Sequence, residues 1–74
     1  MNKKHIAWFD STAMVGKLKG EMAVKGYSLR RMAEELDLNP STLSRIFRGH
    51  EPGVQTATII CAYLEVSLAT FVRP

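Results

Sequence analysis

The sequence has few of the residues that cross-link a chain or interrupt it. A single cysteine, Cys61, excludes an internal disulfide framework and favours a reducing compartment such as the cytoplasm. No apolar run approaches the roughly 18 residues of a membrane span, and the first residues do not resemble a secretory signal peptide. Only five Gly and three Pro are present. We therefore expect the few breaks in the chain to mark the ends of its elements.

The chain is also short and carries little net charge. Its 74 residues suffice for one domain with one core, and 46% hydrophobic with 23% charged residues is not a disordered composition. Ten Lys and Arg against seven Asp and Glu give a net charge of +3. Residues 1–50 hold nine basic and five acidic side chains, whereas residues 51–74 hold one basic and two acidic. This asymmetry favours one polyanion-facing side and one packing side.

Apolar residues recur with helical periodicity through most of the sequence, and no segment alternates as a strand would. We predict a first helix that begins at Asp10 or Ser11 and ends near Lys25, where Gly26 supplies a left-handed stop. A fourth helix is predicted over residues 54–66, followed by a short final helical turn. The predicted fold class is therefore all-α.

The second and third predicted helices are short and lie close together in the sequence. Ser28 is a good N-cap for the second helix, which should end near Asp37 because Asp tolerates a left-handed backbone. Asn39 is an N-cap for the third helix, and Pro40 suits its first position. Two helices joined by about three residues form a helix-turn-helix, which we place at about residues 28–49.

The third predicted helix has a polar face that is typical of DNA recognition. A helix about 10 Å across fits the major groove, about 12 Å wide, where base edges are read by hydrogen bonds. Ser41 and Ser44 offer hydroxyls, and Arg45 can donate two hydrogen bonds to a guanine edge. Arg48 and His50, nearer the helix end, are better placed for backbone phosphates. The alternative is a helical bundle whose polar face is simply solvated.

An ordered set of residues runs through most of the chain and points to a known family. Its members are Ala33, Leu36, Leu38, Ser41, Leu43, Ile46, Gly49, Pro52, residues 64–67 and Phe71. With these residues, the stretch from about Leu18 to Phe71 resembles the Cro/CI-type (XRE) helix-turn-helix domain of phage and bacterial regulators. The resemblance implies a compact five-helix, all-α domain of the lambda-repressor-like type, with its third helix in the major groove of DNA.

The resemblance also implies which side chains contact DNA. Four residues fall at positions that usually face bases: Pro40, Ser41, Ser44 and Arg45. Six fall at positions that usually contact phosphates: Ser28, Arg30, Asn39, Thr42, Arg48 and His50. We expect the DNA-binding domain to occupy residues 11–74.

The N-terminal segment allows more than one interpretation. We assign residues 1–10 to an N-terminal arm, in which Lys3 and Lys4 are candidate DNA contacts. Trp8 and Phe9 either form a hydrophobic staple over the first helix or belong to a surface for a partner.

These features together predict a cytoplasmic, sequence-specific regulator of transcription in a bacterial or phage-infected cell. We expect a repressor that binds double-stranded DNA as a homodimer on a near-palindromic operator, because one reading helix covers too few base pairs. Surplus apolar surface on the fourth helix and the tail gives candidate dimer contacts at Ile59, Tyr63, Val66, Leu68, Phe71 and Val72. The alternative is a protein-interaction module, an antitoxin or antirepressor-type partner with the same fold.

The sequence carries no motif for catalysis or for a bound cofactor. His5, His50 and Cys61 lack the spacing of metal ligands. No set of nucleophile, base and orienting residue is evident, and no glycine-rich loop could cradle a phosphate group. We therefore expect no enzymatic activity, metal, cofactor, small-molecule ligand or membrane partner.

Overall fold

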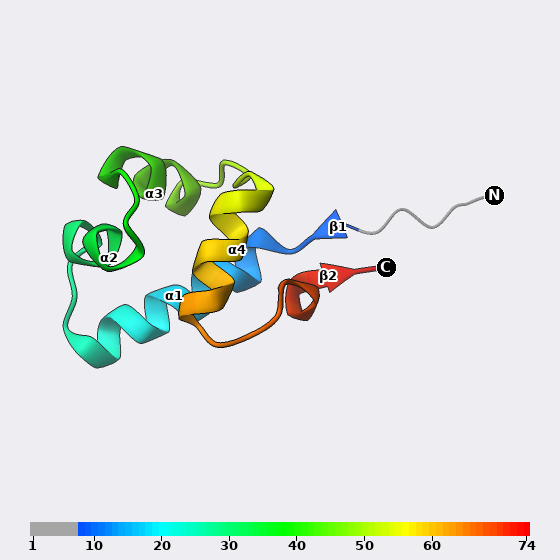
Figure 1. Ribbon diagram of the computed structural model, residues 1–74, viewed down its shortest axis with the longest axis horizontal. Helices are drawn as coiled ribbons and strands as arrows, with labels where there is room; N and C mark the ends of the chain where they lie inside the picture. Colours follow the sequence, from blue (N-terminus) through cyan, green and yellow to red (C-terminus); the bar gives the residue numbers. More distant parts are fainter. Residues whose placement is uncertain (1–7) are drawn as a thin grey trace.

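The structure is a computed structural model that describes residues 8–74. Its elements are β1 (Trp8–Phe9), α1 (Ser11–Lys25), α2 (Leu29–Leu36), α3 (Pro40–Phe47), α4 (Val54–Tyr63), the 3₁₀ helix η1 (Leu68–Phe71) and β2 (Val72–Arg73). The α2–α3 pair lies at one end of the molecule and the two strands lie at the other (Figure 1). Within the described part, no helix is long and apolar enough to cross a membrane. The predicted arm contacts Lys3 and Lys4 lie outside the described residues.

The ends of α1 confirm the prediction from its capping residues. The Asp10 carboxylate accepts a hydrogen bond of 3.0 Å from the backbone N–H of Ala13, which satisfies one of the free donors at the helix start. Gly26 adopts a φ of 68°, and its N–H donates to the carbonyl of Met22. The left-handed residue thus ends the helix where glycine avoids the steric cost of a Cβ.

One core draws on all four α-helices and on η1. Its buried side chains are Met14, Leu18, Met32, Ala33, Leu36, Leu43, Ile46, Ala57, Ile60, Cys61 and Phe71. They come from the apolar stripes that helical periodicity predicts, so each helix turns its other face outward. Burial raises the pKa of the Cys61 thiol, which therefore stays protonated and behaves as a small apolar group.

The prediction of five helices and no strand is correct only in part. Residues 8–74 contain four α-helices, and the expected fifth is the 3₁₀ helix η1. Antiparallel pairing joins β1 to β2, with Trp8 opposite Arg73 and Phe9 opposite Val72. Residues 8–10, which we assigned to the arm, are therefore joined to the C-terminal end of the chain. A strand of two residues is too short to leave an alternating pattern in the sequence.

The end of α4 also differs from the prediction, because the helix stops at Tyr63 rather than near Val66. Glu65 adopts a left-handed backbone with a φ of 61°, and the N–H of Val66 donates back to the carbonyl of Cys61 at 3.0 Å. This closes the helix as a glycine would. The chain can then return through η1 to the start of α1. There the backbone N–H of Asp10 donates a hydrogen bond of 2.7 Å to the carbonyl of Phe71.

Candidate nucleic-acid interface

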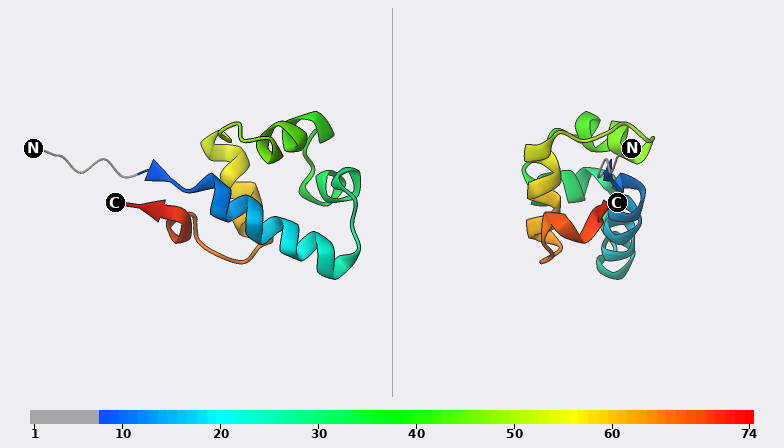
Figure 2. Two further views of the ribbon diagram at one scale, coloured as in Figure 1. Left: turned by 180° about the vertical axis from the view of Figure 1, so that it is seen from behind. Right: turned by 90° about the vertical axis from the view of Figure 1, so that its right-hand side faces the viewer.

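The turn between α2 and α3 is closed by backbone hydrogen bonds. The backbone of Asp37 is left-handed, with a φ of 56°. The backbone N–H of Leu38 donates a hydrogen bond of 2.8 Å to the carbonyl of Ala33. Leu38 packs against the core, so the turn is held from inside. Residues 37–39 separate the two helices. The helix-turn-helix predicted from the sequence is thus confirmed, and it stands clear of the strands in Figure 1 and in the left view of Figure 2.

The start of α3 is fixed by its cap. The side-chain oxygen of Asn39 accepts hydrogen bonds from the backbone N–H of Ser41, at 2.9 Å, and from its hydroxyl, at 2.7 Å. Pro40 occupies the first turn, where its missing N–H costs nothing. Because the Ser41 hydroxyl donates to the cap, its lone pairs remain free to accept a hydrogen bond. The amide N–H₂ of Asn39 is free to donate.

The helix α3 divides into a buried face and an outward face. Leu43 and Ile46 belong to the core, whereas Ser41 and Arg45 are exposed and Ser44 is half-buried. Pro40, the fourth candidate base reader, is half-buried at the start of the helix. The sequence spacing therefore brings the four candidates onto one short helix whose polar positions are accessible. Such a face presents hydrogen-bonding groups without disturbing the core.

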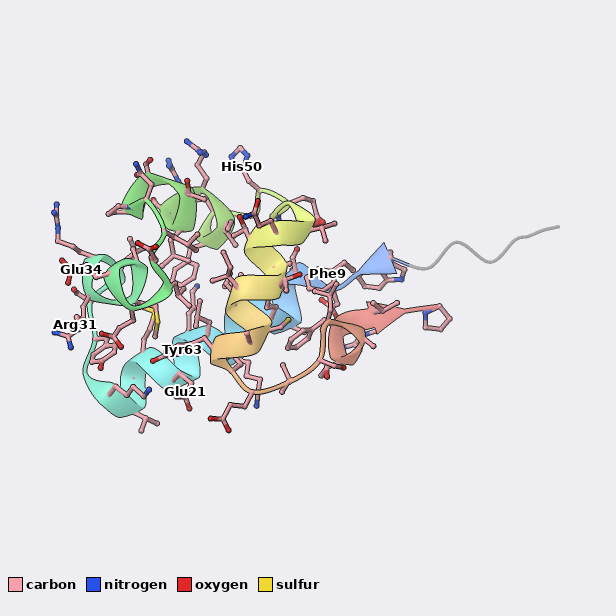
Figure 3. All side chains as sticks on the ribbon, in the orientation of Figure 1. Phe9, Glu21, Arg31, Glu34, His50 and Tyr63 are labelled. Carbon is pink, nitrogen blue, oxygen red and sulfur yellow. The ribbon has the colours of Figure 1, made fainter. Side chains whose placement is uncertain are left out.

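The candidate phosphate contacts fall in two places. Asn39, Thr42, Arg48 and His50 lie on α3 or beside its ends, and all but the half-buried Thr42 are exposed. His50 projects outward beyond the end of α3 (Figure 3).

The other two candidates belong to α2. The Ser28 hydroxyl caps that helix and accepts from the backbone N–H of Arg31 at 3.1 Å, while Arg30 is exposed in its first turn. An uncapped N–H in the first turn can still bind an anion.

The positive charges of α3 are not neutralised by neighbouring carboxylates. Within residues 8–74, ion pairs join Arg31 to Glu35 at 3.4 Å, Lys25 to Glu21 at 3.7 Å and Arg73 to Asp10 at 3.3 Å. In that part of the chain, no carboxylate pairs with Arg45 on α3, with Arg48 at the C-cap of α3, or with Arg30 on α2. These three guanidinium groups can therefore bind a phosphate without first breaking an internal ion pair.

One basic residue near α3, Lys19, was not among the DNA contacts predicted from the sequence. Lys19 of α1 places its ammonium group 5.3 Å from the centre of the Phe47 ring, at the end of α3. Both residues line a cavity of about 250 Å³ whose wall also includes Ser11, Thr12 and Gly49. Nothing in the sequence pattern signals that Lys19 meets α3, because the contact joins elements far apart in the chain.

The candidate dimer residues are mostly occupied within their own chain. Phe71 is only 4% exposed and meets the Phe9 ring edge-on, so its assignment to a partner surface was wrong. Ile59, Tyr63, Val66 and Leu68 are half-buried against the same core, and Val72 is exposed.

Tyr63 is also engaged by a lysine of α1. Its hydroxyl accepts a hydrogen bond of 2.7 Å from the ammonium of Lys25, and this bond raises the pKa of Lys25. Much of the apolar surplus of α4 therefore packs inward.

Comparison with known proteins gives one match. A protein-family model described as helix-turn-helix matches residues 24–71, which is 48 of the 74 residues. The match contains α2, the turn, α3, α4 and η1. No curated protein and no solved structure matches the chain. Within the described residues, no group of three or more His, Cys, Asp or Glu side chains could hold a metal ion.

Proposed function

Because the chain belongs to the XRE family of Cro/CI-type helix-turn-helix proteins, we propose that it is a transcriptional repressor that reads double-stranded DNA through α3. The family is one of DNA-binding regulatory domains and not of enzymes. The observation that carries the proposal is the outward face of α3, where Ser41, Ser44 and Arg45 are accessible on a helix held by its cap. Donors and acceptors so placed can reach base edges in the major groove.

In this proposal each side chain has a distinct task. Arg45 donates two hydrogen bonds to a guanine, and Ser41 accepts a hydrogen bond because its own proton is donated to Asn39. Arg48 and His50, at the end of α3, bind phosphates and fix the register of the helix on the duplex. Specificity comes from Arg45 and Ser41, and most of the affinity comes from the phosphate contacts.

We further propose a homodimer on a near-palindromic operator. A helix of eight residues spans about 12 Å and so covers only a few base pairs. Two copies with their reading helices about 34–36 Å apart would double the sequence read on one face of the duplex. Such a dimer would repress by occupying a promoter, in the cytoplasm of a bacterial or phage-infected cell.

The test is selection of bound sites from random duplex DNA, with wild-type protein and with Arg45→Ala. We expect wild type to enrich a two-fold symmetric site, and Arg45→Ala to lose preference at one position in each half-site, worth about 1–3 kcal/mol. The matched control is Arg31→Ala, which removes an arginine already paired with Glu35. This control should enrich the wild-type site.

Two results would count against the proposal. An unchanged site for Arg45→Ala would show that Arg45 does not read a base. Tight binding to a folded protein, without a salt-sensitive affinity for DNA, would favour the protein-interaction alternative, because phosphate contacts release counterions and must weaken as salt rises.

A further inference from the structure

A cavity of about 250 Å³ lies between α1 and the C-terminal end of α3, and we call it the α1–α3 cavity. Ser11, Val15 and Lys19 line it from one face of α1. Phe47 and Gly49 line it at the end of α3 and just beyond. These segments are far apart in the chain, which is why no small-molecule ligand was expected from the sequence. Pockets for drug-sized ligands measure roughly 300–1,000 Å³, so this cavity suits a smaller molecule with a single ring.

Gly16 keeps the α1–α3 cavity open. It lies inside α1, where glycine stabilises a helix less than alanine does. A Cβ on Gly16 would meet no atom within 4 Å, so close packing does not require a glycine there. Because Gly16 lines the cavity, a larger side chain would fill part of its space. The glycine therefore leaves room that a bound molecule can occupy.

The two ends of the cavity differ in charge. At one end, the ammonium of Lys19 lies 5.3 Å from the centre of the Phe47 ring, and no carboxylate within residues 8–74 pairs with it. At the other end, about 12 Å away along α1, the hydroxyl of Ser11 donates to the carboxylate of Glu51 at 2.9 Å. An anion is therefore favoured beside Lys19 and opposed beside Ser11.

We infer that the α1–α3 cavity binds a small organic acid that has one carboxylate and a flat apolar body. The carboxylate pairs with Lys19, and the body packs against Val15 and Phe47. A hydrogen-bond donor at the far end meets the oxygen of Ser11, whose own proton is given to Glu51. The carboxylate of Glu51 repels a second acid group. A nucleic-acid backbone fits this site less well, because Lys19 is the single ionisable residue among the described residues that line it.

Binding can be measured by NMR on the full chain labelled with ¹⁵N, with 4-hydroxybenzoate as the probe. This molecule has one carboxylate, one ring and a hydroxyl group opposite the carboxylate. We expect saturable shifts of the backbone N–H signals of Gly16 and Gly49, with a dissociation constant of about 1 mM or below. The signal of Trp8, which does not line the cavity, should not move. The neutral counterpart, 4-hydroxybenzyl alcohol, should bind at least about tenfold more weakly, because it lacks the charge that Lys19 attracts.

Two pairs of variants locate the probe. Gly16→Leu fills the cavity and should abolish the shift of the Gly49 signal, whereas Gly20→Leu adds the same side chain to α1 outside the cavity and should bind as wild type. Lys19→Met keeps a long side chain without its charge and should weaken binding at least about tenfold. Its control, Lys17→Met, removes a charge of α1 that does not line the cavity. Circular dichroism checks that all four variants are folded.

The position of the cavity gives the bound acid an effect on DNA binding. Phe47 and Gly49 flank Arg48, which we propose as a phosphate contact. A carboxylate held beside the end of α3 repels phosphates, so a saturating probe should weaken DNA binding about fivefold or more, and DNA should weaken probe binding by the same factor. Total salt is kept constant, because salt alone weakens DNA affinity. This effect rests on the proposed DNA binding, whereas the binding of the acid does not.

Three results would overturn the inference. The absence of a saturable shift up to about 10 mM probe would mean that the cavity does not hold the acid. Equally tight binding of the neutral alcohol, or of inorganic phosphate, would remove the role of the charge or of the ring. Equal binding by Gly16→Leu and Gly20→Leu would place the probe elsewhere. An unchanged DNA affinity with the probe bound would overturn only the effect on DNA, and a chain that binds no DNA would leave the acid site intact.

Discussion

Backbone conformation at single residues decides where the helices end. Gly26 and Gly49 have φ values of 68° and 103°, and two residues with a Cβ, Asp37 and Glu65, are also left-handed. The short polar side chain of Asp tolerates this conformation, so the end of α2 could be predicted from Asp37. The longer Glu has no such tolerance. The early end of α4 at Tyr63 was therefore not visible in the sequence.

The strain at Glu65 predicts a stabilising substitution. Glu65→Gly removes the Cβ that opposes a φ of 61°, and we expect the free energy of unfolding to rise by about 0.5–1 kcal/mol after the extra freedom of the unfolded chain is subtracted. Urea denaturation measures this change. The control Glu65→Ala removes the same charge and keeps the Cβ, so it should not stabilise. If Ala stabilised as much as Gly, the carboxylate and not the backbone would be the cause.

At the level of elements, the predictable parts are those with local signals. The caps Asp10, Ser28 and Asn39 each bond to a nearby backbone N–H, within three residues, and so their helix starts could be predicted. The pairing of β1 with β2 joins residues more than 60 positions apart through two residues on each side. Such pairing depends on how the chain returns through η1. No local pattern contains that information.

In the candidate site, too, local features could be predicted from the sequence and contacts between distant residues could not. The outward face of α3 could be predicted because Ser41, Ser44 and Arg45 and the buried Leu43 are spaced along one helix. The contact of Lys19 with Phe47 could not, because it depends on how α1 packs beside α3. The partner surface assigned to α4 stays a prediction, because Ile59 and Tyr63 are half-buried and helical periodicity shows that a face is apolar but not which neighbour covers it.

The N-cap of α3 makes a prediction that separates folding from DNA binding. Asn39 uses its oxygen for the cap and leaves its N–H₂ group free for a phosphate. Asn39→Asp keeps the capping oxygen, so we expect unchanged thermal stability, and it replaces the donor with a negative charge, so DNA affinity should fall about tenfold or more. Asn39→Ala should lose about 1 kcal/mol of stability as well. An Asp variant that binds DNA as tightly as wild type would limit Asn39 to capping.

At the scale of the whole molecule, net charge describes this protein less well than the placement of its charges. Ion pairs within residues 8–74 hold Lys25, Arg31 and Arg73. Arg45 on α3 and Arg48 at its C-cap have no such partner there. Desolvating a free surface cation at a phosphate breaks no internal bond, whereas a paired one must first give up its carboxylate. The unpaired arginines therefore mark the side that a duplex should approach.

The salt dependence of DNA affinity tests this distinction between free and paired cations. Each phosphate neutralised by a cation contributes about 0.9 to the slope of log K against log salt concentration. Arg48→Ala should therefore lower the slope by about 0.9 for each bound copy, and by about twice that for a dimer. It should weaken binding to all sequences alike, because a phosphate contact carries no base information. Arg31→Ala removes the same charge from a residue paired with Glu35 at 3.4 Å, and we expect it to leave the slope unchanged. Equal slopes for Arg48→Ala and wild type would place Arg48 away from the phosphates, and equal losses in both variants would mean that the ion pair does not shield Arg31.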